Sequence, residues 1–184
     1  MVRVLATIFA LLLAPVLAQA ANITWDSENG YQSDEVELSG LLPQEIQRVL
    51  DSMNKGRKAE ERRNFRKALR NYKRVHKKFP KSQYAPEALF RTSQIRLEQN
   101  NIDKAFDAFE LIAFVYPSYG SFNDMIGEMY KIAVRRQESY RQRLFFILPG
   151  FLNLDRATRY FERVVSIAPY SDYAPLSLMN VAQI

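Results

Sequence analysis

The chain has 184 residues, 47% of them hydrophobic and 25% charged, a composition typical of one globular domain or at most two. It contains no cysteine and one histidine, His76, which excludes disulfide scaffolds, cysteine-based zinc sites, cysteine–histidine nucleophiles and most histidine-ligated metals. The six glycines are scattered singly, so the chain has no glycine-rich phosphate loop. We therefore predict no catalytic, cofactor-binding or metal-binding residues.

Residues 1–20 have the three parts of a secretory signal peptide. Arg3 supplies a positive charge, residues 4–17 are almost uninterruptedly apolar, and the chain then reads Ala-Gln-Ala up to Ala20. A membrane anchor is the alternative, but a helix of this apolar stretch spans about 21 Å of a hydrocarbon core about 30 Å thick. We therefore expect cleavage after Ala20 and an exported, periplasmic protein.

The net charge of +6 hides a strong asymmetry between the next two segments. Residues 21–54 carry seven acidic residues and one basic residue, a net charge of −6. Residues 55–81 carry thirteen basic residues and two acidic ones, a net charge of +11. We expect residues 21–42 to form a flexible acidic segment. Opposite charge would draw the acidic residues 22–45 onto the basic helix around residues 63–78.

The basic segment has the periodicity of a helix. Apolar residues recur at spacings of three and four from Phe65 to Phe79, and basic residues fill the other positions. This charge density attracts nucleic acid, anionic lipid or an acidic protein surface, and export argues against nucleic acid. Two interpretations stay open, a solvated helix face and a dedicated binding site, whose candidate residues are Arg63, Arg66, Arg70 and Arg74.

Internal repetition is the strongest signal in the sequence. Residues 67–89 align without a gap with residues 156–178 at an offset of 89, and a third copy lies at an offset of 37. Each copy has an alanine, an aromatic residue four positions later and a proline twelve positions later. The alanine permits close approach of a partner helix, the aromatic fills the groove, and the proline prevents the helix from continuing. The predicted packing residues are Gly56, Ala68, Tyr72, Pro80, Ala105, Phe109, Pro117, Ala157, Phe161 and Pro169.

This pattern resembles the tetratricopeptide repeat, in which a small residue also precedes the alanine by twelve positions. Gly56 and Ser93 occupy that place in the first two copies. The resemblance implies an all-α fold, a helical solenoid of about three and a half repeats over residues 43–184. Because the last copy stops inside a predicted helix at Ile184, we expect a chain truncated at its C-terminus.

The phrases FPKSQYAPEAL and APYSDYAPLSL resemble the linkers of BamD-like outer-membrane assembly lipoproteins, over roughly residues 50–184. The resemblance implies a non-enzymatic periplasmic scaffold, peripherally associated with the outer membrane, that assists β-barrel insertion. Its partners would be other envelope proteins, barrel-assembly subunits and unfolded outer-membrane proteins, with an anionic membrane surface as a further candidate. The lipid-modified cysteine of that family is missing here. The alternative is an envelope repeat protein that coordinates cell-wall synthesis or division.

The connection before the third copy is enlarged by 15 residues, because the spacing there is 52 rather than 37. A helix predicted from Phe122 overruns the normal repeat length and leads into the uncharged residues 144–152. This apolar stretch either folds back over the concave groove of the solenoid and forms a small hydrophobic core there, or it forms an exposed patch for a partner or lipid. Its candidate partner-binding residues are Phe145, Phe146 and Phe151.

Overall fold

The computed structural model describes residues 25–31, 41–144 and 154–184, with side chains omitted for residues 139–144. These ranges contain seven α-helices and no strand longer than the isolated bridge between Asp26 and Gly30, which confirms the all-α prediction. No helix within these ranges is both long enough and apolar enough to cross a membrane. The helices are α1 (Pro43–Glu61), α2 (Phe65–Lys78), α3 (Tyr84–Glu98), α4 (Ile102–Val115), α5 (Phe122–Leu144), α6 (Leu154–Ile167) and α7 (Tyr173–Ala182).

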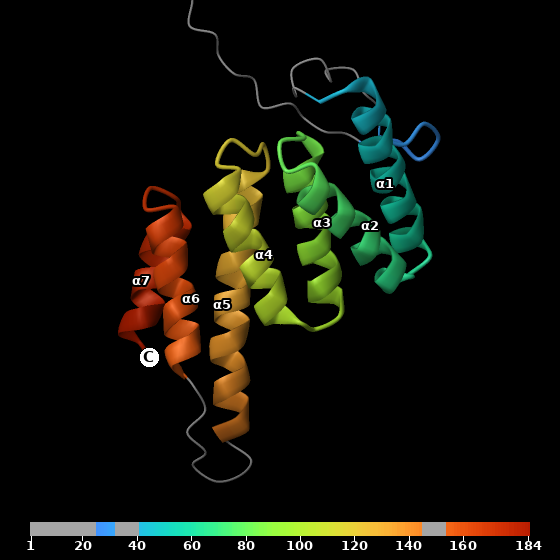
Figure 1. The fold of residues 1–184 in the computed structure, drawn as a ribbon. Helices are drawn as coiled ribbons and strands as arrows, with labels where there is room; N and C mark the ends of the chain where they lie inside the picture. Colours follow the sequence, from blue (N-terminus) through green and yellow to red (C-terminus); the bar gives the residue numbers. More distant parts are fainter. Residues whose placement is uncertain (1–24, 32–40, 145–153) are drawn as a thin grey trace, which may run out of the picture.

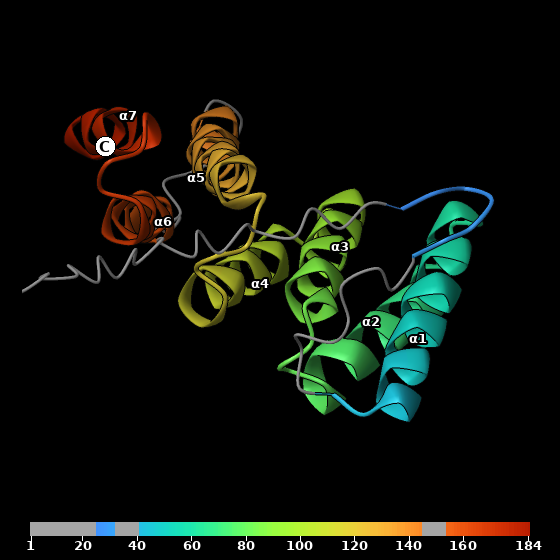
Figure 2. The ribbon, with the colours of Figure 1, turned by 90° about the horizontal axis from the view of Figure 1, so that it is seen from above.

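The helices pack mainly against their neighbours in the chain. Each helix contacts the next one, and α1 also contacts α3, as α5 contacts α7. Seen from above, α2, α4 and α6 form one row and α1, α3, α5 and α7 form the other (Figure 2). The molecule therefore has two layers, built from successive helix pairs.

The internal repetition of the sequence recurs in the backbone. Helices α2, α4 and α6 each have 14 residues, and their first residues are separated by the sequence offsets of 37 and 89. The turn after α2 has three hydrogen bonds, in which the amides of Phe79, Ser82 and Ala85 donate to the carbonyls of Val75, Phe79 and Ser82. The turns after α4 and α6 repeat this pattern at the equivalent positions.

The residues of the repeated pattern occupy equivalent places in the three helix pairs. The three alanines (Ala68, Ala105 and Ala157) and the three aromatics (Tyr72, Phe109 and Phe161) are all buried. Pro80, Pro117 and Pro169 are exposed, and each is the second residue after the end of its helix. Proline at this place cannot extend the helix, so the chain turns.

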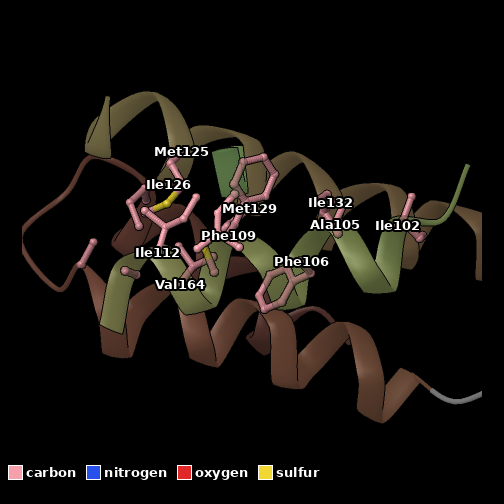
Figure 3. Close-up of a cluster of buried hydrophobic side chains, with 13 residues drawn as sticks. Ile102, Ala105, Phe106, Phe109, Ile112, Met125, Ile126, Met129, Ile132 and Val164 are labelled. Carbon is pink, nitrogen blue, oxygen red and sulfur yellow. The ribbon is translucent and has the colours of Figure 1, made fainter. Parts of the chain in front are cut away.

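The apolar core consists of two clusters. One joins α1, α2 and α3 around Met53, Tyr72 and Ile95. The other extends from α3 to α6, and Figure 3 shows its aromatic and methionine side chains between α4, α5 and α6. Within the second cluster, Phe106 stacks on Tyr160 with ring centroids 4.0 Å apart. Because this cluster crosses several helices, it links the helix pairs into one body.

Helix α5 is longer than its counterpart in the preceding pair. It has 23 residues, whereas α3 has 15, which confirms the predicted overrun of this helix. Its first half carries the buried Met125, Ile126 and Met129. Phe145, Phe146 and Phe151 lie outside the described residues.

The described part of the N-terminal segment packs on α1 and α3. Tyr31 is buried, its amide donates to Asn54 Oδ1 over 2.8 Å, and its ring packs edge-on against Tyr84. The Arg57 guanidinium lies over the Trp25 ring at 4.7 Å. For residues 25–31 these contacts are with α1 and α3, and the docking of the acidic segment on the exposed basic face of α2 stays a prediction. Burial of an aromatic side chain contributes about 1.5–3 kcal/mol, more than screened surface attraction provides.

An inter-helix charge cluster surrounds Asp103 at the start of α4. Its carboxylate accepts hydrogen bonds from Arg136 on α5, and from Arg156 and the Tyr160 hydroxyl on α6. Partial burial opposes ionisation, but the bonds from Arg136 and Tyr160 and the charges of Arg136 and Arg156 outweigh it. They hold the pKa of Asp103 below its ordinary value. The Asp103 carboxylate therefore links α4 to both α5 and α6.

We predict that Gly56→Ala destabilises the protein although alanine normally favours a helix by up to about 1 kcal/mol. A Cβ at position 56 would lie 2.5 Å from Cε1 of the buried Tyr72 ring, and such overpacking costs about 1–3 kcal/mol. Gly127→Ala is the control, because its Cβ would meet the outer end of the half-buried Tyr173 ring, the hydroxyl oxygen at 2.8 Å and Cζ at 3.1 Å, and that end of the ring can move more easily than the buried Tyr72 ring. Urea unfolding should show the larger loss for Gly56→Ala, and equal stability of the two variants would contradict this packing.

We also predict that Asp103→Asn lowers the free energy of unfolding at pH 7 by about 1–2 kcal/mol. The folded-state pKa is depressed, so the stabilisation is present above the ordinary pKa near 4 and is lost as the pH falls through the folded value. Thermal unfolding should therefore show a lower melting temperature for the variant than for the parent at pH 7, and this difference should shrink as acidification protonates Asp103 in the folded parent. Asp107→Asn, an exposed change on the same helix, should shift stability by no more than about 0.5 kcal/mol.

Candidate functional site: a basic groove between α2 and α3

Helices α2 and α3 border a hollow of about 500 Å³ on the surface of the first helix pairs. We call it the basic groove. Helix α2 contributes most of its lining, and α3 forms the opposite wall. The lining residues are Arg66, Leu69, Arg70, Lys73 and His76 from α2, Thr92 and Arg96 from α3, and Gln99, the residue directly after α3.

Helical periodicity brings these residues to one face of each helix. The five residues from α2 are spaced by three and four, the separation of neighbours on one side of an α-helix. The opposite side of α2 buries Ala68, Tyr72 and Val75 against α1 and α3, so the lining residues are turned towards solvent. Leu69 adds an apolar contact among the cations.

The groove carries positive charge without a compensating carboxylate. Arg66, Arg70, Lys73 and Arg96 line it, and no acidic residue is among its lining residues. Within the part of the chain that the structure describes, none of these four forms an ion pair. Arg96 donates instead to Gln99 Oε1 over 3.1 Å. Clustered cations repel one another, so an anion bound here would relieve that repulsion.

His76 is half-buried at the same groove. Burial lowers the pKa of His76 below its ordinary value, and the charges of Lys77 and Lys73 lower it further. The imidazole is therefore neutral near pH 7, and the positive charge of the groove comes from arginine and lysine. An anion bound close to this ring would favour the imidazolium and raise its pKa.

The structure brings together only part of the predicted partner-binding set. Arg66 and Arg70 line the groove, whereas Arg74 lies exposed on α2 outside its lining. Arg63 is in the turn after α1 with a φ of 54°, 3.8 Å from the Glu98 carboxylate and with its guanidinium over the Phe65 ring. Phe145, Phe146 and Phe151 lie outside the described ranges.

Sequence reasoning named only Arg66 and Arg70 of the eight residues that line the groove. Lys73 and His76 continue the spacing of Arg66 and Arg70 along α2, so helical periodicity could have identified them. Arg96 comes from α3, and only the packing of α3 against α2 places it on the opposite wall.

Over the described residues the chain is all-helical, is built of repeated helix pairs and carries a strongly cationic hollow. Comparison with models of protein families gives no match, and no match is found among curated proteins either. Among the residues that the structure describes, no three histidine, aspartate or glutamate side chains are placed to hold a metal ion. The chemistry of the groove therefore points to the recognition of anions.

We predict that Lys73→Gln raises the pKa of His76 towards its ordinary value, because it removes a nearby positive charge. The chain has a single histidine, so one imidazole signal in a proton NMR titration reports the change directly. Lys78→Gln, in the last turn of the same helix, is the matched control and should leave the titration nearly unchanged. Identical titration curves for Lys73→Gln and the parent would contradict the electrostatic description of the groove.

Proposed function

We propose that this protein is a non-enzymatic scaffold of the cell envelope that binds acidic segments of partner proteins in the basic groove. The observation that carries the proposal is the gathering of four cations around a hollow whose lining has no carboxylate. Arginine binds carboxylates through two parallel hydrogen bonds, so Arg66, Arg70 and Arg96 suit such a ligand. Leu69 favours a partner with an apolar or aromatic side chain beside the acidic group.

We further propose that the helix pairs form a tetratricopeptide-repeat solenoid. Three features support this: the equal lengths of α2, α4 and α6, the identical hydrogen bonds of the turns after them, and the burial of the repeated alanines and aromatics. Proteins built in this way present extended surfaces to peptide segments.

The partners that best fit both the groove and the sequence resemblance are unfolded outer-membrane proteins. In the BamD-like family that the linkers resemble, the role is to assist barrel assembly. A barrel C-terminus offers an aromatic side chain and a free carboxylate, the two groups that Leu69 and the arginines would contact. The signal-like residues 1–20 support export to the periplasm, where such segments pass.

The test is the binding of a fluorescent peptide with a C-terminal aromatic residue, as the free acid and as the amide. We expect the free acid to bind in the micromolar range, which corresponds to about −8 kcal/mol, and the amide at least tenfold more weakly. Arg70→Glu should weaken binding of the free acid at least tenfold. Arg74→Glu makes the same charge change on the same helix outside the groove, so it should reduce affinity much less.

Three outcomes would contradict the proposal. Equal binding of the free acid and the amide would show that the groove does not recognise the C-terminal carboxylate of the peptide. Equal effects of Arg70→Glu and Arg74→Glu would show general attraction to a basic helix instead of binding in the groove. Failure of the barrel peptides combined with binding of fragments from peptidoglycan synthases would favour the alternative role in coordinating cell-wall synthesis.

A further inference from the structure

A second surface lies where α2 and α4 end. The last turns of α4 expose three large apolar side chains, with Leu111 at 42%, Phe114 at 61% and Val115 at 51% of their full surface. The last turn of α2 and the following turn expose Lys77, Lys78 and Lys81. We call these six residues the basic–apolar edge.

Comparison of α4 with the equivalent helix α2 shows whether the fold requires the exposed apolar residues of α4. Positions 111, 114 and 115 on α4 correspond, at the offset of 37, to Arg74, Lys77 and Lys78 on α2. Helix α2 has the same length and the same turn geometry as α4, with cations at these positions. The helix pair therefore does not need apolar residues there to fold, and their exposure on α4 needs another explanation.

A hydrogen bond between the turns after α2 and α4 holds the lysines and the apolar residues of this edge near one another. The Tyr116 hydroxyl, at the end of α4, donates to the Pro80 carbonyl in the turn after α2 over 2.9 Å. The turns after α2, α4 and α6 all lie at the same end of the molecule, the upper edge in Figure 1. The turn after α6 adds Tyr170, whose side chain is fully exposed. Lysines, large apolar side chains and a tyrosine thus share one edge.

Acidic residues near this edge do not cancel its charge. Glu110, beside Leu111, is paired with Arg163 at 3.0 Å. Asp107 is exposed one turn before Leu111. Asp124 and Asp172 stand at the starts of α5 and α7, which belong to the other row of helices. The cations at the end of α2 therefore face solvent beside the apolar side chains of α4.

We propose that the basic–apolar edge docks on the surface of an anionic lipid bilayer. Phe114, Val115 and Leu111 enter the interface between headgroups and acyl chains, and the lysines contact the anionic headgroups. Charge complementarity selects this occupant, because long lysine side chains beside exposed apolar side chains match an anionic surface above a hydrocarbon layer. The edge is separate from the lining of the basic groove, so this inference goes beyond the proposed binding of acidic peptides.

The experiment places a tryptophan reporter at the edge of the purified full-length chain. Phe114→Trp is made in a Trp25→Phe background, so that the reporter is the single tryptophan. Leu178→Trp, at an exposed position on α7, is the matched control. Vesicles contain phosphatidylethanolamine with 30% phosphatidylglycerol, or phosphatidylcholine alone. All variants carry the same apolar residues 4–17, so differences between them do not come from that segment.

We expect the tryptophan at position 114 to shift to shorter emission wavelength on anionic vesicles and to be quenched by brominated lipid. The tryptophan at position 178 should show neither effect. Lys77→Glu with Lys78→Glu should weaken vesicle binding at least tenfold, whereas Arg70→Glu in the groove should preserve the blue shift. Such a result would stand even if acidic peptides failed to bind the groove.

Several results would overturn the inference. Absence of binding to anionic vesicles at low salt, equal responses of positions 114 and 178, or equal binding to phosphatidylcholine would each refute docking through this edge. A concentration-dependent dimer without lipid, abolished by Phe114→Ser in analytical ultracentrifugation, would show that a second copy covers the edge. Circular dichroism of each variant identifies a loss of fold, and Val115→Trp provides a second reporter on the same turn.

Discussion

The stacking of the helix pairs depends on the short distance at which neighbouring helices pack. Helix axes approach to about 8–10 Å only where small side chains allow it, and here glycine and alanine stand at those places. Gly56 lies against the Tyr72 ring, and Ala68, Ala105 and Ala157 are buried in the equivalent helices. Because this spacing repeats, the turns after α2, α4 and α6 fall at one end of the molecule. The same spacing fixes the width of the hollow between α2 and α3.

Charge has two different roles in the molecule. The buried Glu87 accepts hydrogen bonds from Arg91 at 2.9 Å, Tyr119 at 2.6 Å and Tyr31 at 3.4 Å, so its carboxylate is satisfied from three parts of the chain. Burial and the nearby Glu87 charge raise the pKa of Tyr119 and Tyr31, which keeps both hydroxyls protonated as donors. The carboxylates that stabilise the fold, Glu87 and Asp103, are therefore paired with arginine and tyrosine side chains. The four cations of the basic groove have no such partner among the described residues, and under the proposed function an acidic segment of a partner protein would supply it.

Sequence periodicity predicted the parts of the fold that depend on local spacing. The helices, their repeated alanines and aromatics, the turns at proline and the long α5 all follow from spacings of a few residues. The docking of Tyr31 could not be derived in this way, because its partner Glu87 is 56 positions away. Arg96 reaches the groove for a similar reason, through the packing of α3 on α2. Net charge alone does not predict the contacts of residues 25–31, because those contacts depend on the burial of an aromatic side chain and not on long-range attraction.

Repetition followed by divergence explains how one small fold carries two different surfaces. The inner positions of α2 and α4 keep the same pattern, because both helices must meet their neighbours at the same distance. The outer positions are free of that constraint, and there α2 has Lys77 where α4 has Phe114. On α2 itself, Lys77 lies four residues after the groove residue Lys73, one helical turn further along the same face. Substitutions at these outer positions leave the buried Ala68 and Tyr72 in place, so the groove and the edge can each change in sequence without loss of the helix packing.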